Sequence, residues 1–151
     1  MTLKTAGEIT PRDISVSTAT QDGATGSRFY PMPGVPKRLT PARAHVSDVS
    51  YDLYNAGDEV VIRQGKVTTI RCGYGARLAH GEVALVCPRL HLSTQGVIIP
   101  NAPGVIDSGH IGDIVVVLTA VGDPVVVRHG EAVAQLLFLK QSNVMKLTDR
   151  G

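Results

Sequence analysis

The segment spanning residues 100–113 carries the residues whose types and spacing best suit catalysis. Asp107 stands between a Gly-Val-Ile run and a glycine-containing strand entry, a pattern that predicts the rim of a β-hairpin, where a carboxylate can face a cavity. A carboxylate in that place can take a proton from water and act as a general base. The alternative is structural, with the same side chain closing the hairpin through an Asx-turn.

Short β-rich runs separated by turn residues must position this segment. They cover residues 59–63, 66–72, 82–87, 97–99, 113–119, 124–128 and 132–139. Strands at this spacing, with almost no helical periodicity, predict an all-β sandwich, jelly roll or barrel. Gly57-Asp58 and Gly65-Lys66 are expected to form hairpin loops in which glycine supplies a positive φ. Residues 1–27 are polar and aperiodic, which predicts an N-terminal arm or a disordered tail before a single domain over residues 28–151.

Composition narrows the class of protein further. Hydrophobic residues make up 43% of the chain but aromatic residues only 4%, so the interior is expected to be aliphatic. The net charge of +2 is too small to indicate nucleic-acid or membrane binding. No apolar run approaches the roughly 20 residues that span a bilayer, and the first residues lack the apolar core of a signal peptide. Cys72 and Cys87 fall in strand-like runs and are interpreted as small buried hydrophobes in a reducing compartment, which predicts a cytoplasmic protein.

The run at residues 114–118 is apolar at every position. Both faces of such a strand must be covered, by a second sheet or by another subunit, so we expect an oligomer. The sequence contains no glycine-rich phosphate loop that opens a helix, no paired-cysteine zinc pattern and no serine nucleophile elbow. These absences exclude several common enzyme classes.

From about Arg28 to Gly151 the chain resembles the dUTPase family, because segments similar to its motifs occur in the family's order. Residues 51–56 (YDLYNA) are similar to the first motif, 86–92 (VCPRLHL) to the second, and 101–113 to the third. Residues 130–138 (GEAVAQLLF) are similar to the fourth motif, and residues 149–151 (DRG) to the opening of the fifth. The resemblance implies a dUTPase-like jelly roll or β-barrel that forms a homotrimer, with its sites between subunits.

The resemblance also implies the chemistry, which is hydrolysis of dUTP to dUMP and pyrophosphate. Asp52 would help to hold Mg²⁺, while Arg89 and Gln135 would bind the phosphates. The third-motif hairpin would read uracil, with Asn101 and Gly104 among its contacts, and Asp107 would activate the attacking water. A triphosphate carries about four negative charges, so a metal ion and an arginine would neutralise charge during in-line attack.

The chain departs from the family's pattern at four places. Leu90 stands where the second motif has a serine that donates to the phosphates, and His91 beside it is either a replacement donor or a solvated residue. His110 replaces the tyrosine that packs under the deoxyribose, and Ala132 stands where an arginine is usual. The chain stops at Gly151, where the family's glycine-rich lid begins, so weak turnover is expected if the chain is whole.

Three functions therefore stay open. The first is a working dUTPase, favoured by the site residues that match the family. The second is a non-catalytic trimer of the same fold with a regulatory or structural role, such as a phage virion component, whose partner engages the N-terminal arm. The third, the related dCTP deaminase, is disfavoured because Val117 stands where that family carries its catalytic glutamate.

Overall fold

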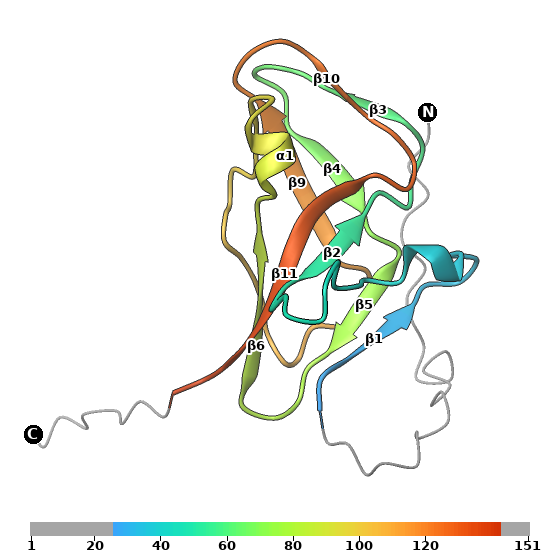
Figure 1. Cartoon of the computed structure of the whole chain (residues 1–151), viewed down its shortest axis with the longest axis vertical. Helices are drawn as coiled ribbons and strands as arrows, with labels where there is room; N and C mark the ends of the chain where they lie inside the picture. Colours follow the sequence, from blue (N-terminus) through green and yellow to red (C-terminus); the bar gives the residue numbers. More distant parts are fainter. Residues whose placement is uncertain (1–25, 143–151) are drawn as a thin grey trace, which may run out of the picture.

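The computed structural model describes residues 26–142, and this part of the chain is almost entirely β-structure (Figure 1). The predicted N-terminal arm up to residue 25 and the fifth-motif residues 149–151 lie outside the described residues. The strands are β1 (Arg28–Pro31), β2 (Tyr51–Tyr54), β3 (Val60–Ile62), β4 (Thr68–Arg71), β5 (Tyr74–Arg77), β6 (Glu82–Cys87), β7 (Val97–Ile98), β8 (Gly104–Ile106), β9 (Val115–Ala120), β10 (Val125–Val127) and β11 (Ala132–Lys140). Two short helices complete the described fold, the 3-10 helix η1 (Lys37–Leu39) and α1 (Leu90–Ser93).

The largest sheet has four strands in the order β2-β11-β6-β8, and all its neighbours are antiparallel. A second sheet has the order β4-β9-β7, while β1 pairs with β5 and β10 pairs with β3. Because β11 joins the first-motif strand β2 to the second-motif strand β6, segments far apart in sequence meet at its centre. The all-β prediction is confirmed.

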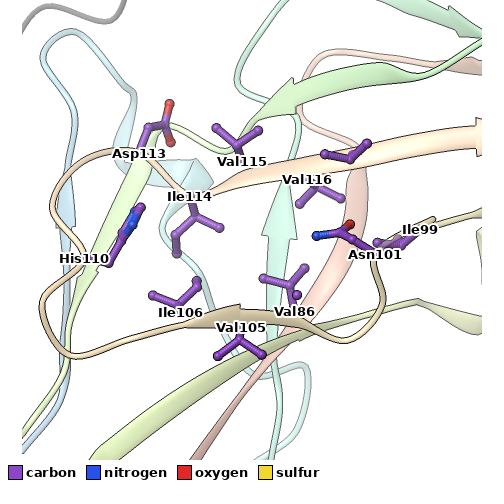
Figure 2. A pocket seen from close by; sticks show the side chains of 12 residues that line it. Val86, Ile99, Asn101, Val105, Ile106, His110, Asp113, Ile114, Val115 and Val116 are labelled. Carbon is purple, nitrogen blue, oxygen red and sulfur yellow. The ribbon is translucent and has the colours of Figure 1, made fainter.

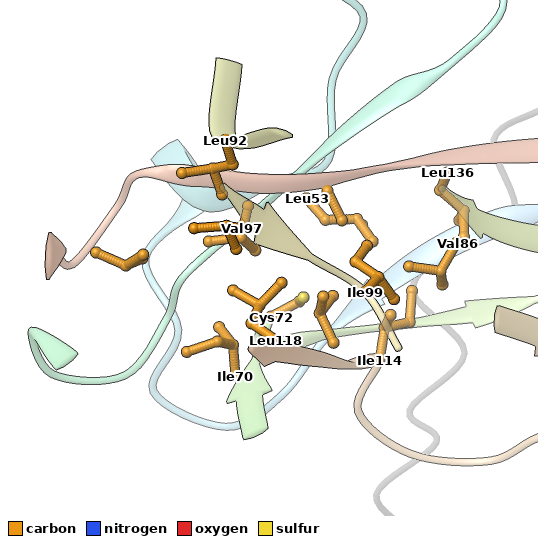
Figure 3. Close-up of a cluster of buried hydrophobic side chains, with 14 of the residues drawn as sticks. Leu53, Ile70, Cys72, Val86, Leu92, Val97, Ile99, Ile114, Leu118 and Leu136 are labelled. Carbon is orange, nitrogen blue, oxygen red and sulfur yellow. The ribbon is translucent and has the colours of Figure 1, made fainter. Parts of the chain in front are cut away.

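An aliphatic core fills the space between these sheets (Figure 3). Leu53, Leu136 and Val86 reach it from the four-stranded sheet, and Leu118 and Ile70 reach it from the β4-β9-β7 sheet. All five are at most 4% exposed. Burial of a Leu, Ile or Val side chain contributes about 1.5–3 kcal/mol, so the shared core holds the two sheets, and the loops that join them, in place.

The apolar strand β9 is covered on one face only within the described part of the chain. Ile114, Val116 and Leu118 are buried in the core, whereas Val115 remains 44% exposed on the opposite face. The expected second sheet therefore covers one face of β9, and the other face stays partly exposed within residues 26–142.

The prediction that Gly57 and Gly65 form hairpin loops with a positive φ was wrong in part. Gly65 has a positive φ of 72°, but Gly57 is absent from the positive-φ glycines. Neither joins a hairpin, because β2, β3 and β4 pair with β11, β10 and β9 and not with one another. Among residues 26–142 no helix is long and apolar enough to cross a membrane.

Candidate active site

Three predicted site residues meet on the four-stranded sheet and form what we call the polar cluster: Asp52, Arg89 and Gln135. Gln135 on β11 lies directly opposite Asp52 on β2 and opposite Cys87 on β6. Arg89 follows β6 by two residues, and its Nε lies 3.3 Å from Asp52 Oδ1. The two side chains are 30% and 19% exposed, so the ion pair is accessible from solvent. The cluster thus offers a cation, a carboxylate and an amide to one ligand.

The amide of Gln135 is held at both ends. Its Oε1 accepts a hydrogen bond from the Ser50 hydroxyl at 2.8 Å, and its Nε2 donates to the carbonyl of Pro88 at 2.8 Å. These bonds fix the orientation of the amide and leave its second Nε2 proton free to donate to a ligand. Ser50 was missed in the sequence, although it lies only two residues before Asp52.

Tyr54 is a second residue of this region that the sequence did not single out. Burial raises the pKa of its phenol above the ordinary value, and the charge of Asp52 raises it further, whereas Arg89 lowers it. Tyr54 therefore remains a neutral phenol at physiological pH. The only available signal was its period-2 spacing from Asp52 along β2, which places both side chains on one face.

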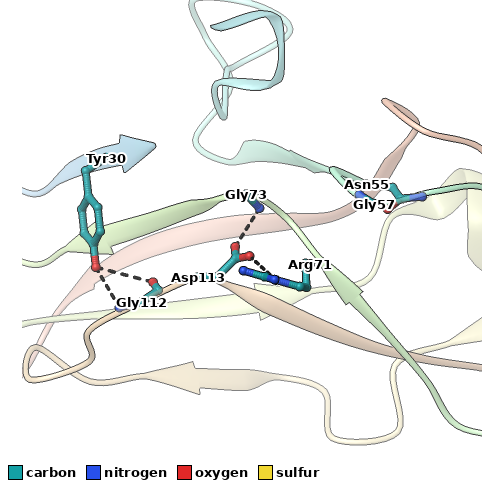
Figure 4. Close-up of polar contacts among 7 residues, drawn as sticks. All are labelled: Tyr30, Asn55, Gly57, Arg71, Gly73, Gly112 and Asp113. Carbon is teal, nitrogen blue, oxygen red and sulfur yellow. Dashed lines mark hydrogen bonds and ion pairs between the residues drawn. The ribbon is translucent and has the colours of Figure 1, made fainter. Parts of the chain in front are cut away.

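Asn55 fixes the strand that carries Asp52. It is 1% exposed, and its Nδ2 donates to the carbonyls of Asp58 at 3.0 Å and Arg128 at 3.3 Å, while its Oδ1 accepts from Gly57 N–H (Figure 4). Its backbone N–H also donates to the carbonyl of Glu131 at 2.8 Å. A buried amide satisfied in this way holds the end of β2 against the start of β11.

A pocket of about 190 Å³ lies between β8, with the residues just before it, and the start of β9 (Figure 2). The β-hairpin predicted here is wrong, because β8 pairs with β6, whereas β9 pairs with β4 and β7. Asn101 contributes a side-chain amide to the pocket and His110 contributes an imidazole ring, while the walls are mainly aliphatic. The volume is below the roughly 300–1,000 Å³ of pockets for drug-sized ligands, so only a small group would fit inside.

Gly104 keeps the floor of this pocket open. A Cβ on Gly104 would lie 3.3 Å from Val86 Cβ and 3.4 Å from Asn101 Nδ2. Even one methyl group would therefore compete with the Asn101 amide for space. The peptide bond between Ala102 and Pro103, in the segment that joins β7 to β8, is cis.

Asp107 follows β8 in an exposed turn, one residue beyond Ile106 of the pocket wall. The turn is closed by the backbone, because the His110 N–H donates to the Asp107 carbonyl at 3.0 Å. Among the described residues nothing donates a hydrogen bond to the Asp107 carboxylate, so the Asx-turn alternative is wrong. The carboxylate is thus exposed to solvent, and its role as a general base stays a prediction.

His91 lies apart from both groups, on α1. Its Nε2 is 3.1 Å from the Gln95 amide nitrogen, and its carbonyl also accepts from that amide at 3.2 Å. Leu90, beside Arg89, is 79% exposed and points no donor at a ligand. A substrate contact of His91 therefore stays a prediction, with the ring engaged inside its own helix.

The polar cluster and the pocket lie on opposite faces of the four-stranded sheet. Residues opposite each other in an antiparallel pair project to the same face, so Asp52, Gln135 and Cys87 share one face. The next row, Val86 and Leu136, is buried in the core, and Gly104 pairs with Val86. The chain therefore assembles the polar cluster and the pocket separately, on the two faces of this sheet.

Comparison with known proteins agrees with the sequence resemblance. The dUTPase family model matches residues 38–150. The chain is 42% identical over 108 residues to the deoxyuridine 5'-triphosphate nucleotidohydrolase of Mycobacterium tuberculosis H37Rv, covering 70% of this chain and 68% of that protein. The corresponding protein of Mycobacterium avium is 41% identical over the same coverage. This chain belongs to the dUTPase family.

Solved structures support the same fold. The dUTPase of Streptococcus mutans superposes with a TM-score of 0.71 and 25% identity, over 78% of this chain and 98% of that one. A mutant dUTPase from phage phi11 of S. aureus superposes with a TM-score of 0.69 at 17% identity, over 82% and 97% of the two chains. The dUTPase-like fold prediction is therefore confirmed.

Proposed function

We propose that this dUTPase hydrolyses dUTP to dUMP and pyrophosphate at a site made by two subunits of a homotrimer. The pocket of one subunit would bind uracil, and the polar cluster of its neighbour would bind the phosphates. The observation that carries this proposal is the position of the two halves on opposite faces of one sheet, each well formed but separate.

An apolar patch supports the contact between subunits. It lies on the same face as the polar cluster and comprises Val83, Leu85, Val105, Leu137 and Leu139. Val105 is 61% exposed and Leu139 45% exposed, as expected for a surface that a partner covers. A subunit that covers this patch would also bring its own residues next to the polar cluster.

The pocket would bind the base and leave the rest of the nucleotide outside. Asn101 would present its side-chain amide, and the backbone between β7 and β8 would pair with the uracil edge as another base does. Because the pattern of donors and acceptors on cytosine differs, that base would leave polar groups in the pocket unpaired. His110 would stack against the deoxyribose.

Asp107 would take the proton from the attacking water. The water oxygen forms a bond to the α-phosphorus, the bond from that phosphorus to the bridging αβ oxygen breaks, and pyrophosphate leaves with the bonding electrons. The exposed carboxylate of Asp107 needs no rearrangement to accept the proton. The backbone hydrogen bond between His110 and Asp107 would keep the general base and the residue that contacts the sugar on one short segment.

Arg89 and Gln135 would bind the phosphate oxygens, Arg89 with charge-assisted hydrogen bonds and Gln135 with its free amide proton. Asp52 fits a magnesium site, because Mg²⁺ commonly binds one or two carboxylates together with substrate phosphates and waters. Within residues 26–142 there is no cluster of three or more acidic, histidine or cysteine side chains that forms a metal cage. The ion would neutralise triphosphate charge when bound with substrate.

The test is release of pyrophosphate from dUTP, with dCTP, dTTP and UTP alongside, first in Mg²⁺ and then in EDTA. Release from dUTP that stops in EDTA is expected. Equal release from dCTP would contradict the assignment of the pocket to uracil. Release from UTP as fast as from dUTP would mean that His110 does not exclude the 2′-hydroxyl.

The second candidate function is binding without hydrolysis, as a regulatory or structural trimer. The exposed Leu90 favours it, since no hydroxyl stands beside Arg89 to donate to a phosphate. In that case the N-terminal arm, residues 1–27, would engage the regulatory or virion partner of the domain at residues 28–151. Tight dUTP binding with no pyrophosphate release would support this candidate. For either function we propose a cytoplasmic location, since Cys72 and Cys87 are both free thiols.

A further inference from the structure

The loop that joins β8 to β9 carries Asp107 and His110, and its position depends on few contacts. We call residues 107–112 the aspartate loop. Before Gly112, the backbone hydrogen bond of this loop is the one inside the turn, from His110 N–H to the Asp107 carbonyl. The position of Asp107, the proposed general base, must therefore depend on contacts at the ends of the aspartate loop.

Tyr30 contacts the end of the aspartate loop at Gly112. Its hydroxyl accepts a hydrogen bond from the Gly112 N–H at 2.9 Å and lies 3.5 Å from the Gly112 carbonyl (Figure 4). The two residues are 82 positions apart in the chain. Tyr30 is on β1, directly opposite Gly75 on β5, so the contact ties an outer strand to the aspartate loop.

Gly75 shows that the position of the tyrosine ring is built into the fold. A Cβ on Gly75 would lie 2.3 Å from Tyr30 Cζ, 2.5 Å from its hydroxyl oxygen and 2.5 Å from the Gly112 carbonyl oxygen. Gly75 is not among the glycines with positive φ, so it is there for space and not for its backbone conformation. The ring of Tyr30 therefore crosses the strand at the one position without a side chain.

The end of the loop beyond Gly112 is fixed independently. Asp113 accepts hydrogen bonds from Gly73 N–H at 2.7 Å and from Arg71 Nε at 2.9 Å, and Ile114 N–H donates to the Tyr74 carbonyl at 2.8 Å. Loss of the Tyr30 hydroxyl would leave these bonds intact. The expected change is thus confined to the aspartate loop.

We propose that Tyr30 is a positioning residue for the reaction, acting through Gly112 to hold Asp107 and His110. This inference rests on the proposed function, because it takes Asp107 as the base. Asn101 and Gly104, the proposed uracil contacts, lie before the loop. The Tyr30 hydroxyl should therefore matter more for turnover than for binding of uracil. A displacement near 1 Å of a catalytic group can cost about a hundredfold in rate, so a partly released loop should cost about tenfold.

The test compares Tyr30→Phe with a matched control, Tyr74→Phe. Tyr74 belongs to the same pair of strands, opposite Pro31, and its hydroxyl also makes one hydrogen bond, with Thr40 at 2.8 Å. Each variant loses one hydroxyl bond, but only Tyr30→Phe loses a bond to the aspartate loop. For Tyr30→Phe we expect kcat to fall about tenfold with KM changed less than about threefold. The control is expected to keep wild-type kcat.

Hydrogen exchange gives a readout that does not depend on turnover. Amides of residues 107–112 should exchange faster in Tyr30→Phe than in the wild type, and should be unchanged in Tyr74→Phe. Unchanged exchange in Tyr30→Phe, or a fall in kcat equal to that of the control, would overturn the proposal. A wild-type protein inactive on dUTP would contradict the proposed function, and exchange would still decide whether Tyr30 holds the loop.

Discussion

Replacing Asp107 with asparagine separates its chemistry from its place in the fold. The carboxylate is exposed and accepts no hydrogen bond from the described residues, and the bond that closes the turn uses the backbone carbonyl, which the substitution keeps. The free energy of unfolding should therefore change by less than about 0.5 kcal/mol. Asparagine is nearly isosteric but cannot take the proton from water.

The expected loss of activity follows from that missing proton acceptor. General base catalysis contributes about 10²–10⁴-fold, so kcat should fall by that factor. At 1.36 kcal/mol for each factor of ten, the barrier rises by about 2.7–5.4 kcal/mol. Pyrophosphate release measures the rate, thermal unfolding the stability and light scattering the assembly state.

The control is Asp123→Asn, which removes a carboxylate from the exposed turn between β9 and β10. Wild-type turnover is expected for that variant. Unchanged turnover in Asp107→Asn would refute the assignment of Asp107 as base. An equal loss in both variants would show that the effect is one of overall charge.

The remaining predictions concern side chains near the polar cluster and in the core. Asp52→Asn should lower the pKa of the Tyr54 phenol and Arg89→Gln should raise it, because these charges now act in opposite directions. Absorbance of the phenolate in alkaline titration would measure this, with Tyr54→Phe to assign the signal, and shifts of the opposite sign would contradict the geometry. In a Cys87→Ser variant, Cys72 should resist thiol reagents until the protein unfolds, because burial raises the pKa of its thiol and keeps it protonated. Rapid labelling of the native variant would show that the core around Cys72 opens.

The sequence predicted the strands that lie within visible runs of β-branched and apolar residues, whatever their length. Residues 82–87 and 97–99 correspond to β6 and β7, and the run at 132–139 to β11. The strands that were missed, β1, β2, β5 and β8, are at most four residues long, and their side chains do not show a clean alternation. Pairing across the sheet, which local pattern does not reveal, makes these segments strands.

The sequence predicted which residues belong to the polar cluster, but it did not predict how they are arranged. The motif resemblance named Asp52, Arg89 and Gln135 separately, and the structure brings them together through the register of β11 with β2 and β6. Register depends on long-range pairing, so the opposite faces of the two halves could not be read from motif order. Cys87 illustrates the same limit: its run is apolar, yet the register turns it outward beside Gln135, and it is only half-buried.

Tyr30 was invisible for a different reason. It precedes all the resemblance motifs, and its hydroxyl meets Gly112 only because β1 crosses Gly75. A glycine that is needed for space gives no local signal in the sequence, in contrast to Gly65, where the turn itself requires a positive φ.

The most direct test of a site shared between subunits is to mix two inactive variants, Asp107→Asn in the aspartate loop and Arg89→Ala in the polar cluster. Both are co-expressed in equal amounts, and dUTP hydrolysis is measured on mixed trimers isolated through two tags. If each site takes its loop from one subunit and its cluster from the next, each mixed trimer holds one intact site, about a third of its sites, and regains activity that both parents lack. Mixed trimers as inactive as their parents would contradict the account, because a site contained within one subunit always carries one of the two defects.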